Sequence, residues 1–182
     1  MIFFKVFSGS VRLSLDMKKS VLALVLLALT VLPAFAQTGS PEPLYKQFPG
    51  LPPISILKTD SSTLFTQKDL KKNCQTLLII FSPECDHCKK ETEELLASID
   101  KFKKIQIVMA TPMPFDKMKE FYEHYKLAGY SNITVGQDSK FLLPTFYKVR
   151  MLPFMAFYDK KGTIIDVKEG NLPIDQVLKK FE

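Results

Sequence analysis

The most restrictive feature of the sequence is a pair of cysteines placed where an apolar segment gives way to an amphipathic one. Residues 76–81 (TLLIIF) are apolar and rich in β-branched side chains, which predicts a buried central strand that Pro83 ends. From Cys85 onward the apolar side chains recur at helical spacing, which predicts an amphipathic helix. The chain is therefore expected to adopt an α/β fold in which Cys85-Asp86-His87-Cys88 joins a strand to a helix.

The rest of the pattern alternates between strand and helix signals. We expect strands at residues 54–58, 105–110, 133–135, 153–159 and 163–168, helices at 115–127 and 173–181, and helical turns at 66–72 and at 141–148, the last interrupted by Pro144. This order predicts one α/β domain over residues 54–182, a central mixed β-sheet flanked by helices. Residues 37–53 carry five Pro and two Gly, so we expect an extended leader without regular structure that lies on the domain.

Residues 1–36 have the pattern of a secretory signal peptide. Two lysines follow Met17, residues 21–32 are apolar, and Ala34-Phe35-Ala36 matches a cleavage motif. We expect the true start at Met17 and cleavage after Ala36. The apolar run is shorter than the ~20 residues that a membrane-spanning helix needs, so no stable membrane anchor is expected. The predicted location is periplasmic or otherwise extracytoplasmic.

The net charge of +6 depends partly on this segment. Removing residues 1–36 takes away four of the 25 basic residues and one of the 19 acidic ones, which leaves +3. Nucleic-acid binding calls for a stronger basic patch, so no nucleic-acid partner is expected. Separately, the protein is predicted to be a monomer. The lysine doublets are interpreted as scattered solvated faces; they are Lys71-Lys72, Lys89-Lys90, Lys103-Lys104, Lys160-Lys161 and Lys179-Lys180.

The position of the cysteine pair favours redox chemistry. Free N–H groups and the positive end of the helix dipole favour the thiolate form of Cys85. His87 acts in the same direction, whereas the charges of Glu84 and Asp86 oppose it. The two-residue spacing lets Cys88 close a disulfide with Cys85. In the expected cycle, Cys85 attacks a disulfide of a partner protein and Cys88 resolves the mixed disulfide, or the reverse occurs.

Other uses of the cysteines were compared with this one. A structural zinc site needs four ligands, and the chain offers only Cys74, His87 and His124 besides the pair, so no metal is expected. Haem attachment needs a His directly after the second cysteine, where Lys89 stands. Cys74 is predicted to be a lone, partly buried thiol beyond disulfide reach of Cys85. An inert structural disulfide remains open, and the only expected cofactor is the redox-active Cys85–Cys88 disulfide itself.

The run TLLIIFSPECDHCKKE, followed about 65 residues later by Leu152-Pro153 and FMAFYDKKGTIIDV, resembles the thioredoxin fold. It is most similar to the exported TlpA/ResA-like thiol-disulfide oxidoreductases. The resemblance implies that Cys85 is the exposed nucleophile and Cys88 the buried resolving thiol. It also implies that Pro153 is a cis-proline opposite the dithiol, with the backbone of Leu152 available to pair with an extended substrate segment.

The same resemblance implies that Glu91 is an acid near the thiols that takes part in proton handling. The alternative is an ordinary solvated charge in the run Lys89-Lys90-Glu91. The chain departs from the family at Glu84, where the family has Trp, and in the Asp86-His87 dipeptide between the cysteines. These departures leave the redox direction open.

The leading hypothesis is an extracytoplasmic thiol-disulfide oxidoreductase that exchanges disulfides with the thiols and disulfides of partner proteins, with reduction favoured. A second hypothesis is a binding or assembly module on the thioredoxin fold, stapled by a structural disulfide. A third is a thiol peroxidase. Ser82 lies three residues before Cys85, as in peroxidase sites, but Leu78 stands where that pattern has Pro.

Overall fold

A computed structural model describes residues 19–20 and 42–182. Apart from residues 19–20, the predicted signal peptide lies outside the described residues, as do its start at Met17 and its cleavage after Ala36. Residues 42–182 form one compact unit. Within the described part of the chain, no helix is long and apolar enough to cross a membrane.

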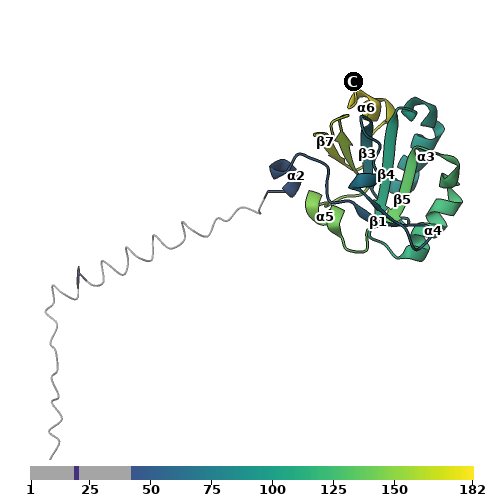
Figure 1. Ribbon diagram of the computed structural model, residues 1–182. Coiled ribbons are helices and arrows are strands. Elements are labelled where there is room, and N and C mark those ends of the chain that lie inside the picture. Colours follow the sequence, from purple (N-terminus) through teal and green to yellow (C-terminus); the bar gives the residue numbers. More distant parts are fainter. Residues whose placement is uncertain (1–18, 21–41) are drawn as a thin grey trace, which may run out of the picture. The chain divides into compact units, whose positions relative to one another are not determined.

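The unit is built on a seven-stranded mixed sheet in the order β2-β1-β5-β4-β3-β6-β7 (Figure 1). The three central strands β3, β4 and β5 are parallel, and every other pairing is antiparallel. The strands are β1 Ser55–Lys58, β2 Leu64–Thr66, β3 Gln75–Ile80, β4 Ile105–Thr111, β5 Ile133–Gln137, β6 Phe154–Tyr158 and β7 Ile164–Glu169. The predicted central mixed sheet flanked by helices is confirmed.

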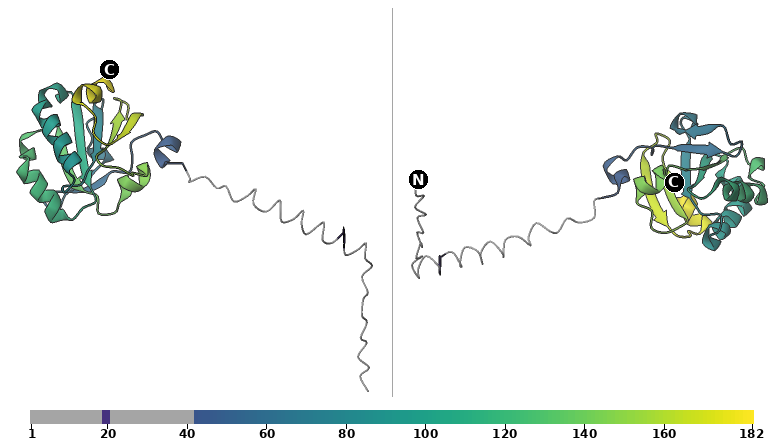
Figure 2. Two further views of the ribbon diagram at one scale, coloured as in Figure 1. Left: turned by 180° about the vertical axis from the view of Figure 1, so that it is seen from behind. Right: turned by 90° about the horizontal axis from the view of Figure 1, so that it is seen from below.

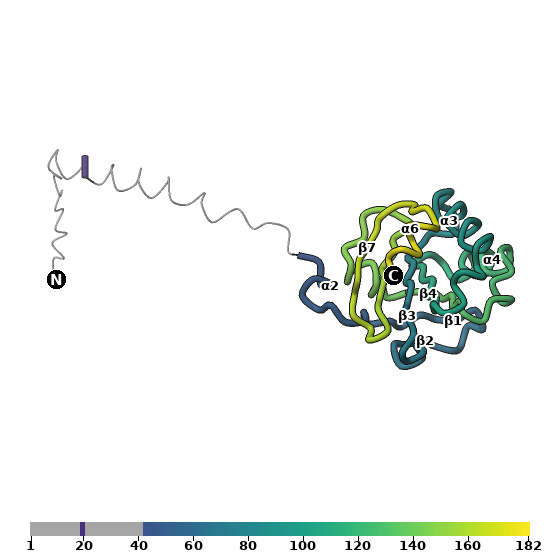
Figure 3. Tube along the Cα trace, turned by 90° about the horizontal axis from the view of Figure 1, so that it is seen from above, coloured from purple at the N-terminus to yellow at the C-terminus, as the bar shows by residue number. Residues whose placement is uncertain are grey.

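Helices cover both faces of this sheet. They are α2 Leu44–Gln47, α3 Asp86–Ala97, α4 Phe115–His124, α5 Leu142–Tyr147 and α6 Ile174–Lys179, with 3-10 turns η2 Gln67–Asp69, η3 Ile99–Phe102 and η4 Leu127–Gly129. Side chains of α3, α4 and α6 pack in one apolar layer, and those of α5 and the leader pack in the other. In the view from above, α3 and α4 lie on one side of β3 and β4 and α2 lies on the other (Figure 3), and Figure 2 gives the views from behind and from below.

The central strand β3 contributes to both layers because successive side chains of a strand point to opposite faces. Leu77 and Ile79 belong to the layer under α3 and α4, whereas Leu78 and Ile80 belong to the layer under α5. All four are 3% exposed or less, as expected for a strand with helices on both faces. The apolar run that predicted a buried central strand therefore supplies the middle of the core.

Three details differ from the sequence-based prediction. Strand β2 was not predicted, and the helical turn expected at residues 66–72 is limited to η2. Thr66 and Asp69 bond reciprocally across this turn as a capping box. Pro144 does not interrupt α5, because it lies in the first turn, where a backbone N–H has no partner within the helix.

The leader is also more regular than predicted. The expectation of no regular structure in residues 37–53 is wrong for α2, a single helical turn whose Tyr45 ring packs 5.8 Å from the ring of Tyr147. The rest of the described leader lies on the domain. Pro49 O accepts a hydrogen bond of 2.7 Å from Ile164 N–H, which ties the leader to β7.

Candidate dithiol site

The cysteine pair lies where β3 ends and α3 begins. Cys85 is the N-cap residue of α3, in extended conformation (φ −82°, ψ 119°), and Cys88 lies in the first turn. Cys85 is partly exposed, whereas Cys88 is 1% exposed within the apolar layer under α3. Both thiols are free, as is Cys74, which is partly buried as predicted. The site thus presents one accessible thiol and one enclosed thiol a single helical turn apart.

The environment of Cys88 keeps it protonated. Burial, with smaller contributions from the neighbouring Cys85 and Glu91, raises the pKa of this thiol to about 12, although a hydrogen bond from the backbone of Ser82 opposes the rise. At neutral pH Cys88 is therefore a thiol. Its conversion to a nucleophile requires a proton acceptor nearby.

Glu91, the acid that the family resemblance implies near the thiols, lies three residues after Cys88 on α3. It lies on the buried face of α3 and is 3% exposed, so the interpretation as a solvated charge is wrong. Its Oε2 accepts hydrogen bonds from Asn171 Nδ2 (2.9 Å) and Leu172 N–H (3.1 Å). Burial raises the pKa of this carboxyl, and the two hydrogen bonds limit the rise. A buried carboxyl with a raised pKa beside a buried thiol is an arrangement suited to proton transfer.

Asn171 was not identified from the sequence. Its Nδ2 also donates to the backbone oxygen of His87 (2.8 Å), so one amide contacts both the first turn of α3 and the Glu91 carboxylate. It lies 84 residues beyond His87, in the loop after β7, and no local motif marks it. Only the folded chain reveals this contact.

The Leu152–Pro153 peptide bond is cis. Pro153 is buried and directly precedes β6, whose first residue Phe154 pairs with Ile80 at the end of β3. This pairing puts Pro153 at the end of the sheet where the dithiol lies. Pro153 O accepts a hydrogen bond from Gly170 N–H (2.8 Å), which connects this segment to the loop that carries Asn171. Leu152 is half-buried against both apolar layers.

The remaining predicted site residue, His87, is exposed in the first turn of α3. Next to it, Asp86 forms an exposed ion pair with Lys89 (3.0 Å). Exposed pairs of this kind contribute little to stability. His87 itself is accessible at the surface, two residues after the partly exposed Cys85.

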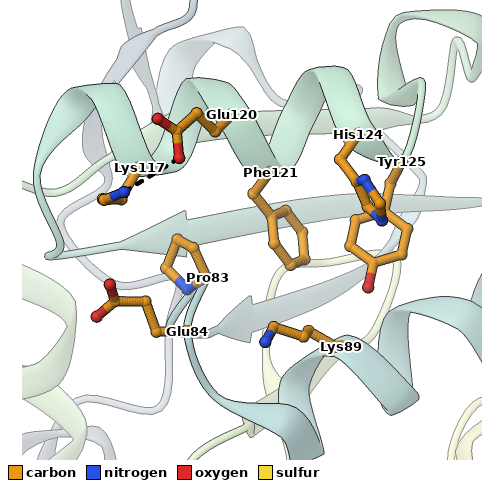
Figure 4. Close-up of a pocket in the computed structure, with 8 residues that line it drawn as sticks. All are labelled: Pro83, Glu84, Lys89, Lys117, Glu120, Phe121, His124 and Tyr125. Carbon is orange, nitrogen blue, oxygen red and sulfur yellow. Dashed lines mark hydrogen bonds and ion pairs between the residues drawn. The ribbon is translucent and has the colours of Figure 1, made fainter.

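A cavity of about 530 Å³ flanks the site, between the Pro83-Glu84 segment that precedes Cys85 and helix α4 (Figure 4). Phe121 of α4 and Tyr125, the C-cap residue of this helix, extend into it, with their ring centroids 4.6 Å apart. Polar and charged side chains surround these two rings: Glu84, Lys89, Lys117, Glu120 and His124. An exposed His124 agrees with its interpretation as a surface or boundary residue.

No group of three or more His, Cys, Asp or Glu side chains that would hold a metal ion occurs among residues 19–20 and 42–182. The expectation that the site works without a metal remains a prediction. The described site offers two thiols, a carboxyl and backbone groups for chemistry.

A model of the thioredoxin-like domain matches residues 66–182. The chain belongs to this family. No curated protein sequence matches it significantly. Among solved structures, it is similar to DsbF of Mycobacterium tuberculosis, with 20% identity, 77% of this chain and 96% of that chain covered, and a TM-score of 0.60.

Two further solved structures with this fold carry different names, one a disulfide oxidoreductase and one a peroxidoxin. A secreted disulfide oxidoreductase of M. tuberculosis, homologous to E. coli DsbE, has 19% identity, 69% and 92% coverage of this chain and that chain, and a TM-score of 0.58. The peroxidoxin BcpB of M. tuberculosis has 14% identity, 72% and 92% coverage, and a TM-score of 0.61. Similarity at this level shows the fold alone. The function of this thioredoxin-like chain must be argued from its site.

Proposed function

We propose that the chain is an extracytoplasmic thiol-disulfide oxidoreductase of the TlpA/ResA type, which exchanges disulfides with partner proteins and mainly reduces them. One observation carries the proposal: at the start of α3, a partly exposed Cys85 thiol and a buried Cys88 thiol lie one turn apart, both free. A partner protein can reach only the first. The second is held for the intramolecular step.

In the first step, the Cys85 thiolate attacks one sulfur of a disulfide in the partner. A new bond forms between Cys85 Sγ and that sulfur as the partner's S–S bond breaks. The partner's other sulfur leaves as a thiolate and takes a proton from solvent.

In the second step, Cys88 gives up its proton and attacks Cys85 Sγ. Glu91 receives this proton. Its carboxylate lies close enough to raise the pKa of Cys88, and burial raises the pKa of Glu91 itself, which makes it a stronger base. The bond between Cys85 and the partner breaks, and the partner's second sulfur leaves and is protonated. The partner has then gained two electrons and two protons, and Cys85 and Cys88 are joined as a disulfide, which an external thiol donor reduces.

The surroundings of Cys85 support binding of a protein segment. The backbone of Leu152, beside the cis-Pro153, would pair with an extended stretch of the partner, and the exposed His87 would contact it from the other side. The cavity bordered by Glu84 would accept a side chain next to the partner's cysteine. We propose no cofactor beyond the Cys85–Cys88 disulfide, and a monomeric protein without a nucleic-acid partner or membrane anchor.

The extracytoplasmic location rests on the signal-peptide pattern of residues 1–36, with cleavage after Ala36. Expression of the full chain fused to a reporter that is active only after export tests this part of the proposal directly.

The catalytic proposal is tested by reduction of a protein disulfide with dithiothreitol as the electron donor. Cys85→Ala is expected to abolish acceleration by the chain, whereas Cys74→Ala, a matched change at the third cysteine, is expected to retain it. In a single turnover after the dithiothreitol has been removed, pre-reduced Cys88→Ala should accumulate mixed disulfides on Cys85, because neither the resolving thiol nor an external thiol is present to break them. Full activity of Cys85→Ala would show that the proposal is wrong.

A further inference from the structure

Two of the lysine doublets interpreted as scattered solvated faces meet in the folded chain. Lys71-Lys72 precede β3, and Lys160-Lys161 form the turn between β6 and β7. The pairing of Thr76 with Tyr158 brings these two segments together at one end of the sheet. With Lys68 of η2, they line a cavity of about 350 Å³, here named the basic pocket.

The basic pocket has a one-sided charge. Five lysines line it, and no aspartate or glutamate does. None of the five takes part in an ion pair within the described residues, whereas most ion pairs there use lysines elsewhere on the surface. Five ammonium groups around one concavity produce a concentrated positive potential, which attracts anions.

The nearest acidic groups in the sequence are committed to other contacts. The Asp69 carboxylate accepts hydrogen bonds from the backbone N–H and the hydroxyl of Thr66 (2.7 and 2.8 Å). Asp159 Oδ1 accepts hydrogen bonds from Lys161 N–H and Thr163 N–H, both 2.8 Å. These carboxylates stabilise the turns that hold the lysines.

The backbone around the pocket is also fixed from inside the domain. Gln106, buried on β4, accepts from Lys71 N–H (2.8 Å) and donates to Lys71 O (3.1 Å). Leu51 of the leader packs at Gly162, where a Cβ would come within 3.0 Å of it. The segments that carry the lysines are therefore held in place before any ligand arrives, which lowers the entropic cost of binding.

We propose that the basic pocket binds a multiply charged anion of the phosphate class, either a free compound or a lipid headgroup. Each lysine ammonium offers three donors and one full charge, which suits phosphate oxygens. Five positive charges exceed the one negative charge of a single carboxylate, so an anion with several negative charges matches the pocket better. A compact concavity favours a compact anion over an extended acidic peptide.

This site is separate from the dithiol. The pocket lies where β3 begins at Gln75, and the dithiol follows the other end of β3 at Ile80, roughly 20 Å away at the usual rise of a strand. Anion binding and disulfide exchange can therefore be tested independently of each other. Loss of one does not entail loss of the other.

The test uses the full chain, inorganic tripolyphosphate as the free probe, and vesicles of phosphatidylcholine with or without phosphatidylglycerol. Calorimetry and vesicle sedimentation measure binding. We compare Lys71→Gln/Lys160→Gln with the control Lys119→Gln/Lys140→Gln, which removes the same charge from exposed sites outside the pocket. The pocket variant should bind at least about tenfold more weakly, and the control within about twofold of wild type. Both should retain disulfide exchange.

If tripolyphosphate binds saturably and the vesicles do not bind, the ligand is a free phosphate compound. If the chain prefers vesicles that contain phosphatidylglycerol, the ligand is a lipid headgroup. Either result, with the expected order of the variants, supports the proposal. The proposal is overturned if neither probe binds saturably, if the control variant weakens binding as much as the pocket variant, or if a polyglutamate peptide binds more tightly than both phosphate probes.

Discussion

Cys88 should react with thiol reagents far more slowly in the folded protein than in the unfolded chain. The test variant is Cys74→Ser/Cys85→Ser, which leaves Cys88 as the only thiol. In the fold this side chain is 1% exposed, and burial is the main reason that its pKa is raised. Both features oppose attack on an alkylating reagent, which requires a thiolate.

The magnitude follows from the pKa. A rise from 9.0 to about 12 lowers the thiolate fraction at pH 7 from about one in a hundred to about one in a hundred thousand. This thousandfold change corresponds to about 4 kcal/mol. Replacing Cys85 removes two smaller contributions and leaves burial, so we expect alkylation of Cys88 to be slowed at least about a hundredfold by folding.

The assay follows iodoacetamide labelling by mass spectrometry, with and without urea. In the folded variant the rate should rise about tenfold per pH unit up to about pH 11, because the thiolate fraction is still growing there. Cys74→Ser/Cys88→Ser, which leaves only Cys85, is the matched control and should be labelled readily without urea. Labelling of folded Cys88 within tenfold of its rate in urea, or a plateau below pH 10, would refute the reasoning.

Four other outcomes follow from particular contacts. Asn171→Ala removes a hydrogen bond that limits the pKa of Glu91, so the acidic limb of the pH profile of disulfide reduction should move to higher pH, with a loss of about 1 kcal/mol in unfolding free energy. Gly136→Ala puts a Cβ 2.8 Å from a side chain and 2.9 Å from a carbonyl oxygen, so urea denaturation should show a loss of about 1–3 kcal/mol. Tyr147→Phe leaves the buried hydroxyl of Tyr158 without its partner and should cost about 1–3 kcal/mol, part of which Tyr147→Phe/Tyr158→Phe restores. In the wild type, folding raises the pKa of Tyr158 from 10.0 to about 12. The contribution of this tyrosine to the free energy of unfolding is therefore complete below pH 10 and is lost as the pH rises through about 12. Urea denaturation should accordingly give a lower free energy of unfolding at pH 11 than at pH 7.

Local patterns were sufficient for the central elements. The apolar run at residues 76–81 became β3, and the helical spacing after Cys85 became α3, because burial on two faces and on one face leave different periodicities. The C-terminal hairpin and final helix were also placed within one or two residues. The expectation for the leader failed at α2, where one helical turn packs against α5 despite the surrounding prolines.

Features that depend on long-range pairing were not visible in the sequence. Asn171 approaches Glu91 across 80 residues of chain. The lysines at 71–72 and 160–161 look scattered because only the register of β3 against β6 brings them together. Whether Glu91 was solvated or buried also depended on how α3 is rotated on the sheet. Contacts of this kind follow from packing, which local sequence does not encode.

The central claim is that Cys85 and Cys88 form a reversible disulfide in the folded protein. The most direct measurement equilibrates the chain with reduced and oxidised glutathione over a range of ratios, traps the thiols with acid and an alkylating reagent, and counts them by mass. We expect a two-electron transition that involves Cys85 and Cys88 and leaves Cys74 out. Thiols that stay reduced at every ratio, or a disulfide that is reduced only after unfolding, would contradict the account.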